Sequence, residues 1–286
     1  MTWGAATLQS VRAVLTVGGI AVAAVLALKI AALLLEPRLT FYPVREQAAT
    51  PSALGMPFED VFLEAADGVR LHGWLVPGVG KASLTLLFFH GNAENIAGCL
   101  DLAKLTRPAG YDLLLVDYRG YGQSEGRPSE AGLYQDGRAA LAYLRSRQGR
   151  EPGRIVVWGR SIGAAVAVEV AAADPSGTAG VILESSFTSV PDLLRSDGHW
   201  FMYAVSRFGT YRFDSAARIG RVRAPALVIH GTADDIAPFS LGRRLFDLAP
   251  GRKDFVAIEG AGHNDLFPLH EDEVWDAVRR FLTTLE

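Results

Sequence analysis

The chain has 286 residues, with 28 lysines and arginines against 31 aspartates and glutamates, so its formal net charge is −3 and we expect no nucleic-acid partner. Hydrophobic residues make up 49% and charged residues 21%, proportions that fit a folded domain joined to an apolar segment. The single cysteine, Cys99, excludes an internal disulfide and a thiolate metal cluster; we expect it to be a buried apolar residue, and we expect no cofactor and no metal.

An apolar helix is the first predicted element. Residues 11–35 are apolar apart from Arg12 and Lys29, and at about 1.5 Å per residue they can cross a hydrocarbon core of about 30 Å. A cleaved signal peptide would also be apolar, but the amino-terminal region has one arginine and no convincing small-residue cleavage site follows the apolar run. We therefore expect residues 1–38 to be a retained single-pass membrane anchor, with a transmembrane helix at about 11–35.

The charges around this helix indicate the side of the membrane that the rest of the chain occupies. Lys29, Arg38 and Arg45 lie on the side of the remaining chain, whereas Arg12 and the amino terminus lie on the other. Lysine and arginine favour the cytoplasmic side of a membrane. The balance slightly favours a cytoplasmic location for residues 39–286.

Alternating strands and helices follow the anchor, which is typical of a mostly parallel sheet covered by helices on both faces. Two strands around Asp67-Gly68 predict an antiparallel hairpin at the start of the sheet. The eight predicted strands are residues 58–65, 69–76, 84–89, 111–116, 154–158, 180–183, 226–229 and 254–258. One α/β domain can absorb all of residues 39–286.

The segment Gly159-Arg160-Ser161-Ile162-Gly163 predicts a nucleophile elbow between the strand 154–158 and a helix over 164–173. Such a turn is too tight for side chains two residues either side of the serine, so both positions must be glycine. Ser161 is the predicted nucleophile. A second copy of the pattern surrounds Ser124, but it follows no strand and no helix starts until after Pro128, so we do not expect Ser124 to react.

Acyl transfer also needs backbone amides that stabilise the oxyanion, each worth about 2.7 to 4 kcal/mol. Ile162, directly after the nucleophile, is one expected donor. The other is expected in the loop after the strand 84–89, where we choose Asn92, with Ala93 as the alternative.

A cap over the site is predicted in residues 187–222, a stretch too long for a simple crossover. The segment is rich in aromatic residues, among them Trp200 and Tyr203. Such a cluster can simply pack, but a cap also has to present apolar surface to an acyl chain beneath it. We expect the cap to help bind the acyl group.

The histidine that activates Ser161 has to lie on a loop that can reach it. His263 lies in a glycine-flanked loop between the strand 254–258 and the final helix, and is the predicted base. His90 and His230 each close an apolar strand and are expected to support loops. The remaining three, His72, His199 and His270, are interpreted as packed or solvated.

The acid is expected in the loop after the strand 226–229, which contains two adjacent aspartates. We choose Asp234, because the order Ser161, Asp234, His263 is the order that such an elbow requires. Asp235 is interpreted as a loop residue or as a cap of the helix that begins near Pro238. Glu184, after the strand 180–183, is the reserve acid.

Seven short motifs are spread over nearly the whole chain: residues 39–43, 67–74, 89–95, 117–124, 159–163, 230–234 and 260–265. Together they resemble the Bem46-like group of α/β-hydrolases and the related ABHD13 and ABHD17 serine hydrolases. The resemblance implies an α/β-hydrolase fold, and it implies that the loop of Ser124 is a family feature without the nucleophile. The N-terminal cysteine cluster of the ABHD17 proteins is missing here, so no acylated N-terminus is implied, and depalmitoylation is an analogy only.

The motifs predict a membrane-anchored serine hydrolase that cleaves a carboxylic ester or thioester of a small or lipid-like acyl substrate through an acyl-enzyme on Ser161. One alternative is a serine peptidase of the same fold, although the chain has no propeller or other gating domain. The other is a non-catalytic scaffold tethered to the membrane, whose expected mark would be a missing member of the triad.

Overall fold

One eight-stranded sheet organises the part of the chain that the computed structural model describes, residues 3–80, 82–147, 152–196 and 198–286. The strand order is β1-β2-β4-β3-β5-β6-β7-β8; β2 is antiparallel to both β1 and β4, and the other neighbouring pairs are parallel. This confirms the predicted mostly parallel sheet and its antiparallel first hairpin. The strands are β1 (Glu59–Glu64), β2 (Arg70–Val76), β3 (Thr85–Phe89), β4 (Asp112–Val116), β5 (Ile155–Arg160), β6 (Gly180–Glu184), β7 (Ala226–Gly231) and β8 (Lys253–Ile258).

Helices cover both faces of the sheet, because its central strands are apolar on both sides. Successive residues of one strand alternate between two buried clusters, so that Val157 lies in the first and Trp158 in the second. The first cluster includes α3 (Glu130–Ser146), α4 (Ile162–Ala173), α7 (Ser215–Ile219) and α8 (Phe239–Leu248), and the second includes α2 (Leu100–Thr106) and α9 (Leu266–Thr283). Three short 3-10 helices, Pro51–Leu54, Ile96–Cys99 and Pro152–Arg154, lie between these elements; Cys99 ends the second, buried as predicted.

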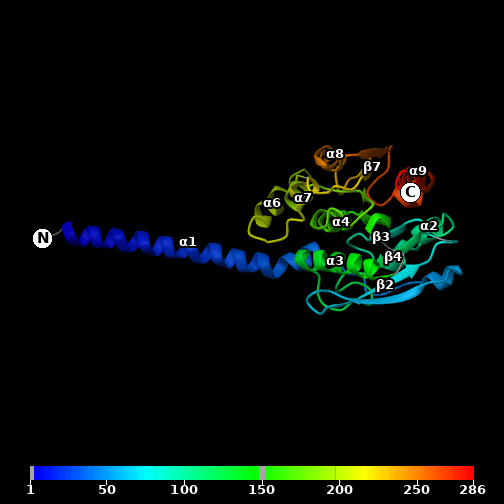
Figure 1. Cartoon of the computed structure of the whole chain (residues 1–286). Coiled ribbons are helices and arrows are strands. Elements are labelled where there is room, and N and C mark those ends of the chain that lie inside the picture. Colours follow the sequence, from blue (N-terminus) through cyan, green and yellow to red (C-terminus); the bar gives the residue numbers. More distant parts are fainter. Residues whose placement is uncertain (1–2, 81, 148–151, 197) are drawn as a thin grey trace.

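Helix α1 (Trp3–Thr40) projects from the body, with its amino-terminal part far from the sheet (Figure 1). Its segment Leu15–Thr40 contains an 18-residue window with a mean hydropathy of 2.4 and is exposed almost throughout, so it is a candidate membrane span by length and composition. The helix is longer than the predicted 11–35 at both ends: it starts at Trp3 and continues through Pro37 to Thr40. The body stabilises its last turn: the Asn92 side-chain amide donates to the Thr40 carbonyl, 2.6 Å away, which a helix end would otherwise leave without a partner.

The division into an anchor, 1–38, and a catalytic domain, 39–286, stays a prediction. Residues 1 and 2 of that anchor lie outside the described residues.

The segment predicted as a cap contains α5 (Val190–Ser196), α6 (Trp200–Ser206) and α7. Its aromatic residues divide between two environments. Phe213 is fully buried and packs edge-on against Phe41 and Tyr134. Trp200 and Phe201 are instead 63% and 78% exposed, on a helix that lies beside α1 (Figure 1).

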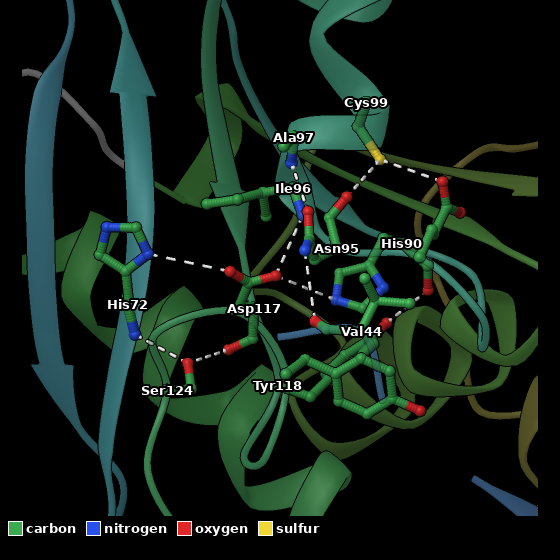
Figure 2. A network of polar contacts seen from close by, with 12 residues as sticks. Val44, His72, His90, Asn95, Ile96, Ala97, Cys99, Asp117, Tyr118 and Ser124 are labelled. Atoms are coloured by element: carbon green, nitrogen blue, oxygen red, sulfur yellow. Dashed lines mark hydrogen bonds and ion pairs between the residues drawn. The ribbon is translucent and has the colours of Figure 1, made fainter. Parts of the chain in front are cut away.

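A buried polar network connects strand β2 with the loops that follow β3 and β4 (Figure 2). The carboxylate of Asp117, after β4, accepts a hydrogen bond from the Ile96 amide at 3.0 Å and lies 3.5 Å from His90 and 3.8 Å from His72. The hydroxyl of Ser124 donates to the Asp117 carbonyl at 2.7 Å and accepts from the His72 amide at 2.9 Å. The serine of the second glycine-flanked pattern therefore connects β2 to the end of β4.

Replacing Ser124 with alanine is expected to lower the free energy of unfolding by about 1–3 kcal/mol, because the buried His72 amide loses its acceptor. Thermal unfolding in detergent measures the change. Fluorophosphonate labelling of the folded variant is expected to equal that of the wild type. Loss of labelling in a Ser124→Ala protein with wild-type stability would contradict the structural role of Ser124.

Candidate active site

The chain reverses sharply at Ser161, between the end of β5 and the start of α4. Ser161 has φ 55° and ψ −117°, a conformation that costs a non-glycine residue about 1–3 kcal/mol. A Cβ on Gly159 would lie 2.1 Å from the Gly163 carbonyl oxygen, and one on Gly163 would lie 2.1 Å from the Phe89 carbonyl oxygen. Both approaches are to backbone, which cannot give way, so the requirement for two glycines is confirmed.

Three loops bring together the three residues chosen from the sequence as nucleophile, base and acid. The Ser161 hydroxyl lies 3.0 Å from Nε2 of His263. Nδ1 of His263 lies 2.8 Å and 3.0 Å from the two carboxylate oxygens of Asp234. Since a carboxylate only accepts, Nδ1 carries the proton and donates to Asp234, which leaves Nε2 free to accept from the serine.

The loop around Asp234 keeps this carboxylate ionised. Its Oδ1 accepts hydrogen bonds from the amides of Ala237 at 2.7 Å and Ile236 at 3.0 Å, and its Oδ2 lies 3.3 Å from Nε2 of His230. Burial by itself would raise the pKa of Asp234, but the contacts with His230 and His263 and the amide donors hold that pKa well below its usual range. His230 thus supports the acid, as expected of a residue that closes a strand.

The two other candidate acids are placed differently. Asp235 is exposed, and the residue that precedes α8 is Pro238, so the prediction that Asp235 could cap that helix is wrong, and it is a loop residue. Pro238 is the N-cap, with φ −49° and ψ 135°, and no side chain caps this helix start. Glu184 is buried and accepts hydrogen bonds from Arg160 at 2.7 Å and from the Trp158 indole at 3.2 Å. Its carboxylate therefore stabilises the strand residues that lead into the elbow.

The two candidate oxyanion donors come from different segments, the start of α4 and the loop after β3. Ile162 is the first residue of α4, where the backbone N–H points out of the helix. The side chain of Asn92 points away, toward the end of α1: its amide donates to Thr40, and its oxygen accepts from Tyr121 at 2.8 Å and Tyr42 at 3.3 Å. Both Asn92 and Ile162 line the same cavity as Ser161, as does Ala93; the role of their amides stays a prediction.

Sequence reasoning missed an ionic cluster under the elbow. Arg160 pairs with Glu184 and lies 3.6 Å from Glu94, and Glu94 in turn accepts from the Gly91 amide at 2.7 Å. Burial raises the pKa of Glu94 by itself, but Arg160 reverses this effect and the pKa is lowered. The cluster fixes the loop of Asn92 relative to Ser161. Its sequence signal is Glu94 three residues after Gly91, the spacing of a side chain that caps its own loop.

Ser161 and His263 line a cavity of about 1100 Å³ whose lining is mostly apolar. The cap contributes Phe201, Met202 and Val205, whereas Trp200 and Tyr203, the residues singled out from the sequence, are absent from this lining and pack edge-on against each other. Helix α1 contributes a second set of side chains that the sequence did not predict. Within the described residues, no three histidine, cysteine, aspartate or glutamate side chains are grouped so as to hold a metal ion.

Comparison with known proteins identifies the family. A family model described as "Serine aminopeptidase, S33" matches residues 80–215. The chain is 32% identical to the alpha/beta hydrolase domain-containing protein WAV2 of Arabidopsis thaliana, over 93% of this chain and 92% of that protein. It is 34% identical to protein bem46 of Schizosaccharomyces pombe, over 77% and 76%. The solved Pyrococcus furiosus esterase Pf2001 has the same fold, with a TM-score of 0.71, 20% identity, and coverage of 85% of this chain and 98% of that one.

The chain therefore belongs to the α/β-hydrolase family that includes bem46 and WAV2. Family and fold together support a hydrolase.

Proposed function

We propose that the protein is a membrane-anchored serine hydrolase that cleaves a carboxylic ester or thioester through an acyl-enzyme on Ser161. The observation that carries the proposal is the hydrogen-bonded chain from Asp234 through His263 to the Ser161 hydroxyl, at the wall of an apolar cavity. A strained serine with a base and an ionised acid in line is the arrangement that acyl transfer requires. The esterase named among the solved structures has the same fold, which is consistent with this chemistry.

The proposed reaction needs no group beyond the chain and water. Nε2 of His263 takes the hydroxyl proton as Ser161 Oγ attacks the acyl carbonyl. The backbone N–H groups of Ile162 and Asn92 stabilise the oxyanion. His263 then gives the proton to the departing alcohol or thiol. In the second half, His263 takes a proton from water, whose oxygen attacks the acyl-enzyme, and returns it to Ser161 as the carboxylic acid leaves.

Two features of α1 support a retained membrane anchor. The exposed, apolar segment Leu15–Thr40 is long enough to span a bilayer. Its last turns also contact the catalytic body: Glu36 accepts hydrogen bonds from the amides of Thr210 and Tyr211, both at 2.8 Å. A cleaved signal segment would leave those amides without this acceptor. The cytoplasmic placement rests on the flanking charges alone.

A serine peptidase is the second candidate, because the matching family model is named for an aminopeptidase. An aminopeptidase has to bind the substrate's ammonium group with a carboxylate that is not otherwise engaged. The carboxylates that line the cavity already accept hydrogen bonds or pair with cations of the protein. They are Glu36 with the cap amides, Glu94 with Gly91, Asp101 with Lys104, and Glu184 with Arg160.

Purified protein is therefore expected to hydrolyse p-nitrophenyl butyrate at least about 100-fold faster than leucine p-nitroanilide, because an unpaired ammonium is costly in an apolar cavity. The measurement is kcat/KM for both substrates, with fluorophosphonate labelling as the independent readout of the serine. Faster cleavage of the anilide would favour the peptidase. A folded protein without labelling and without turnover would favour the tethered scaffold.

A further inference from the structure

Helix α1 supplies one wall of the cavity that contains Ser161. Leu28, Ala31, Ala32 and Leu35 line it, and their spacing of three and four residues puts them on one face of the helix. The cap helix α6 adds Phe201, Met202 and Val205 to the same lining. The cavity thus lies between a helix that is elsewhere exposed and apolar and the cap that covers the triad.

Hydrogen bonds hold α1 in place beside the cap and beside the loop of Asn92. Glu36 accepts from the amides of Thr210 and Tyr211 and, at 2.9 Å, from the Thr210 hydroxyl, which joins α1 to the cap. Four residues later, the Thr40 carbonyl accepts from Asn92, which joins α1 to the candidate oxyanion loop. Helix α1 is therefore held on both sides of the cavity and is more than a tether.

The wall lies at the depth of lipid acyl chains if α1 spans a bilayer. A hydrocarbon core of about 30 Å takes about 20 helical residues, whereas the apolar span Leu15–Thr40 has 26. Counted from Leu15, the core ends near Leu34. Leu28, Ala31 and Ala32 then lie in the last two turns of the core and Leu35 lies at its edge. Glu36 lies where headgroups and water tolerate a carboxylate. Lys29 can extend its ammonium to the same boundary.

The rim of the cavity is apolar on both elements. Leu35 and Leu39 of α1 are 48% and 51% exposed, and Phe201, which lines the cavity from α6, is 78% exposed. Its neighbour Trp200 is 63% exposed, and tryptophan is the residue that favours the headgroup level of membranes. Exposed apolar side chains on a candidate membrane helix and on the cap, which line one cavity together, fit lipid better than water.

We propose that α1 is the specificity wall of the acyl site, and that the acyl chain reaches Ser161 directly from the bilayer along Leu28, Ala31 and Leu35. The occupant is the chain of an ester or thioester held in the membrane, with its leaving group toward the headgroups. A cavity of about 1100 Å³ exceeds the usual range for small ligands and has room for a long chain. This inference rests on the proposed serine hydrolase and on its membrane anchor.

The test uses the full chain in vesicles of ether-linked phosphatidylcholine, which offers no ester of its own. The two substrates are 4-methylumbelliferyl palmitate in the vesicles and 4-methylumbelliferyl butyrate in water. Ala31→Trp places a large ring in the cavity from an exposed helix position, and we expect the ratio of palmitate to butyrate rates to fall about tenfold. The matched control is Ala24→Trp, two turns earlier on the same face and outside the lining, which keeps the wild-type ratio.

Surface dilution tests the source of the chain. When more ether lipid is added at fixed bulk palmitate ester, the rate is expected to fall with the mole fraction of the ester in the membrane. A rate that follows only the bulk concentration would overturn access from the bilayer. An unchanged ratio in Ala31→Trp, with fluorophosphonate labelling retained, would overturn the specificity wall alone. A folded wild type that neither labels nor cleaves either ester would remove the proposed function and this inference with it.

Discussion

Replacing Ser161 with alanine is expected to lower kcat/KM for p-nitrophenyl butyrate by about 10⁴- to 10⁶-fold and to abolish fluorophosphonate labelling. In the proposed reaction the hydroxyl oxygen of Ser161 forms the acyl-enzyme, and neighbouring groups cannot replace it. Glu184 is bound to Arg160, and the Ser124 hydroxyl is bound within the buried network. The remaining activity would come from the amides that stabilise the oxyanion.

The matched control is Ser124→Ala, the serine of the other glycine-flanked pattern. It is expected to lose stability but to keep labelling, whereas Ser161→Ala is expected to keep stability, because the only hydrogen bond of the Ser161 hydroxyl among the described residues is to His263. Mass spectrometry of the labelled wild type is expected to find the modification on Ser161. Wild-type turnover by a folded Ser161→Ala protein would rule out this serine as the nucleophile.

The elbow could be predicted from the sequence because its requirements are local. The chain reverses within a few residues, so Gly159 and Gly163 are dictated by contacts of 2.1 Å with nearby backbone, and the flanking apolar run specifies the strand. The sheet follows from the same kind of information, since eight apolar runs separated by turns predict its strands. The pairing of Asp234 with His263 was inferred from order along the chain, which the topology of parallel strands translates into position.

The parts that the sequence did not predict depend on contacts between distant segments. Pro37 normally ends a helix, but α1 continues to Thr40 because Asn92, 52 residues away, binds its last turn. The aromatic residues of the cap could not be divided in advance into core, cavity and surface, since Trp200 and Phe201 are neighbours with different roles. Glu36 looks from sequence like the polar end of an apolar helix, and its partners at Thr210 and Tyr211 lie 174 and 175 positions along.

These contacts join the proposed anchor and the proposed chemistry into one unit. Asn92 connects the end of α1 to the loop whose amide is the candidate oxyanion donor, and Arg160 and Glu94 connect that loop to the elbow from the other side. Displacement of α1 would therefore move both the specificity wall and the loop of Asn92, because packed elements transmit shifts to their neighbours. A protein truncated to residues 39–286 would therefore lack the α1 side chains that line the cavity.

Replacing Asp234 with asparagine is expected to lower kcat for p-nitrophenyl butyrate by about 10⁴-fold with little change in KM. The amides of Ile236 and Ala237 still require an acceptor, so the asparagine oxygen stays at the position of Oδ1 and its NH2 group takes that of Oδ2. That NH2 then replaces Oδ2, the nearer of the two oxygens to Nδ1 of His263 at 2.8 Å, while the farther oxygen at 3.0 Å is already occupied by the two amides. Two donors cannot pair, so His263 adopts the other tautomer, with its proton on Nε2 toward Ser161, and no longer accepts the serine proton.

Asp235→Asn is the matched control for this variant, because Asp235 is the exposed neighbour and the same chemical change there leaves the contact between Asp234 and His263 in place. It is expected to keep wild-type kcat, and Glu184→Gln is expected to retain the pH profile of the wild type even if its stability falls. A 10⁴-fold loss in Asp235→Asn, with Asp234→Asn active, would exchange the roles of the two aspartates.

The same carboxylate makes stability depend on pH in a direction that its environment fixes. The pKa of Asp234 is lower in the folded protein than the value of about 3.9 in an unfolded chain, so ionised Asp234 stabilises the fold at every pH above that value. The contribution is lost as pH falls through the folded pKa, because protonation removes an acceptor from His263 and His230. The stability gap between wild type and Asp234→Asn, measured by thermal unfolding, is therefore expected to shrink below about pH 4. A gap that widened there would mean that the carboxylate is held in the fold as the neutral acid, and a neutral acid could not orient His263 for the chemistry proposed.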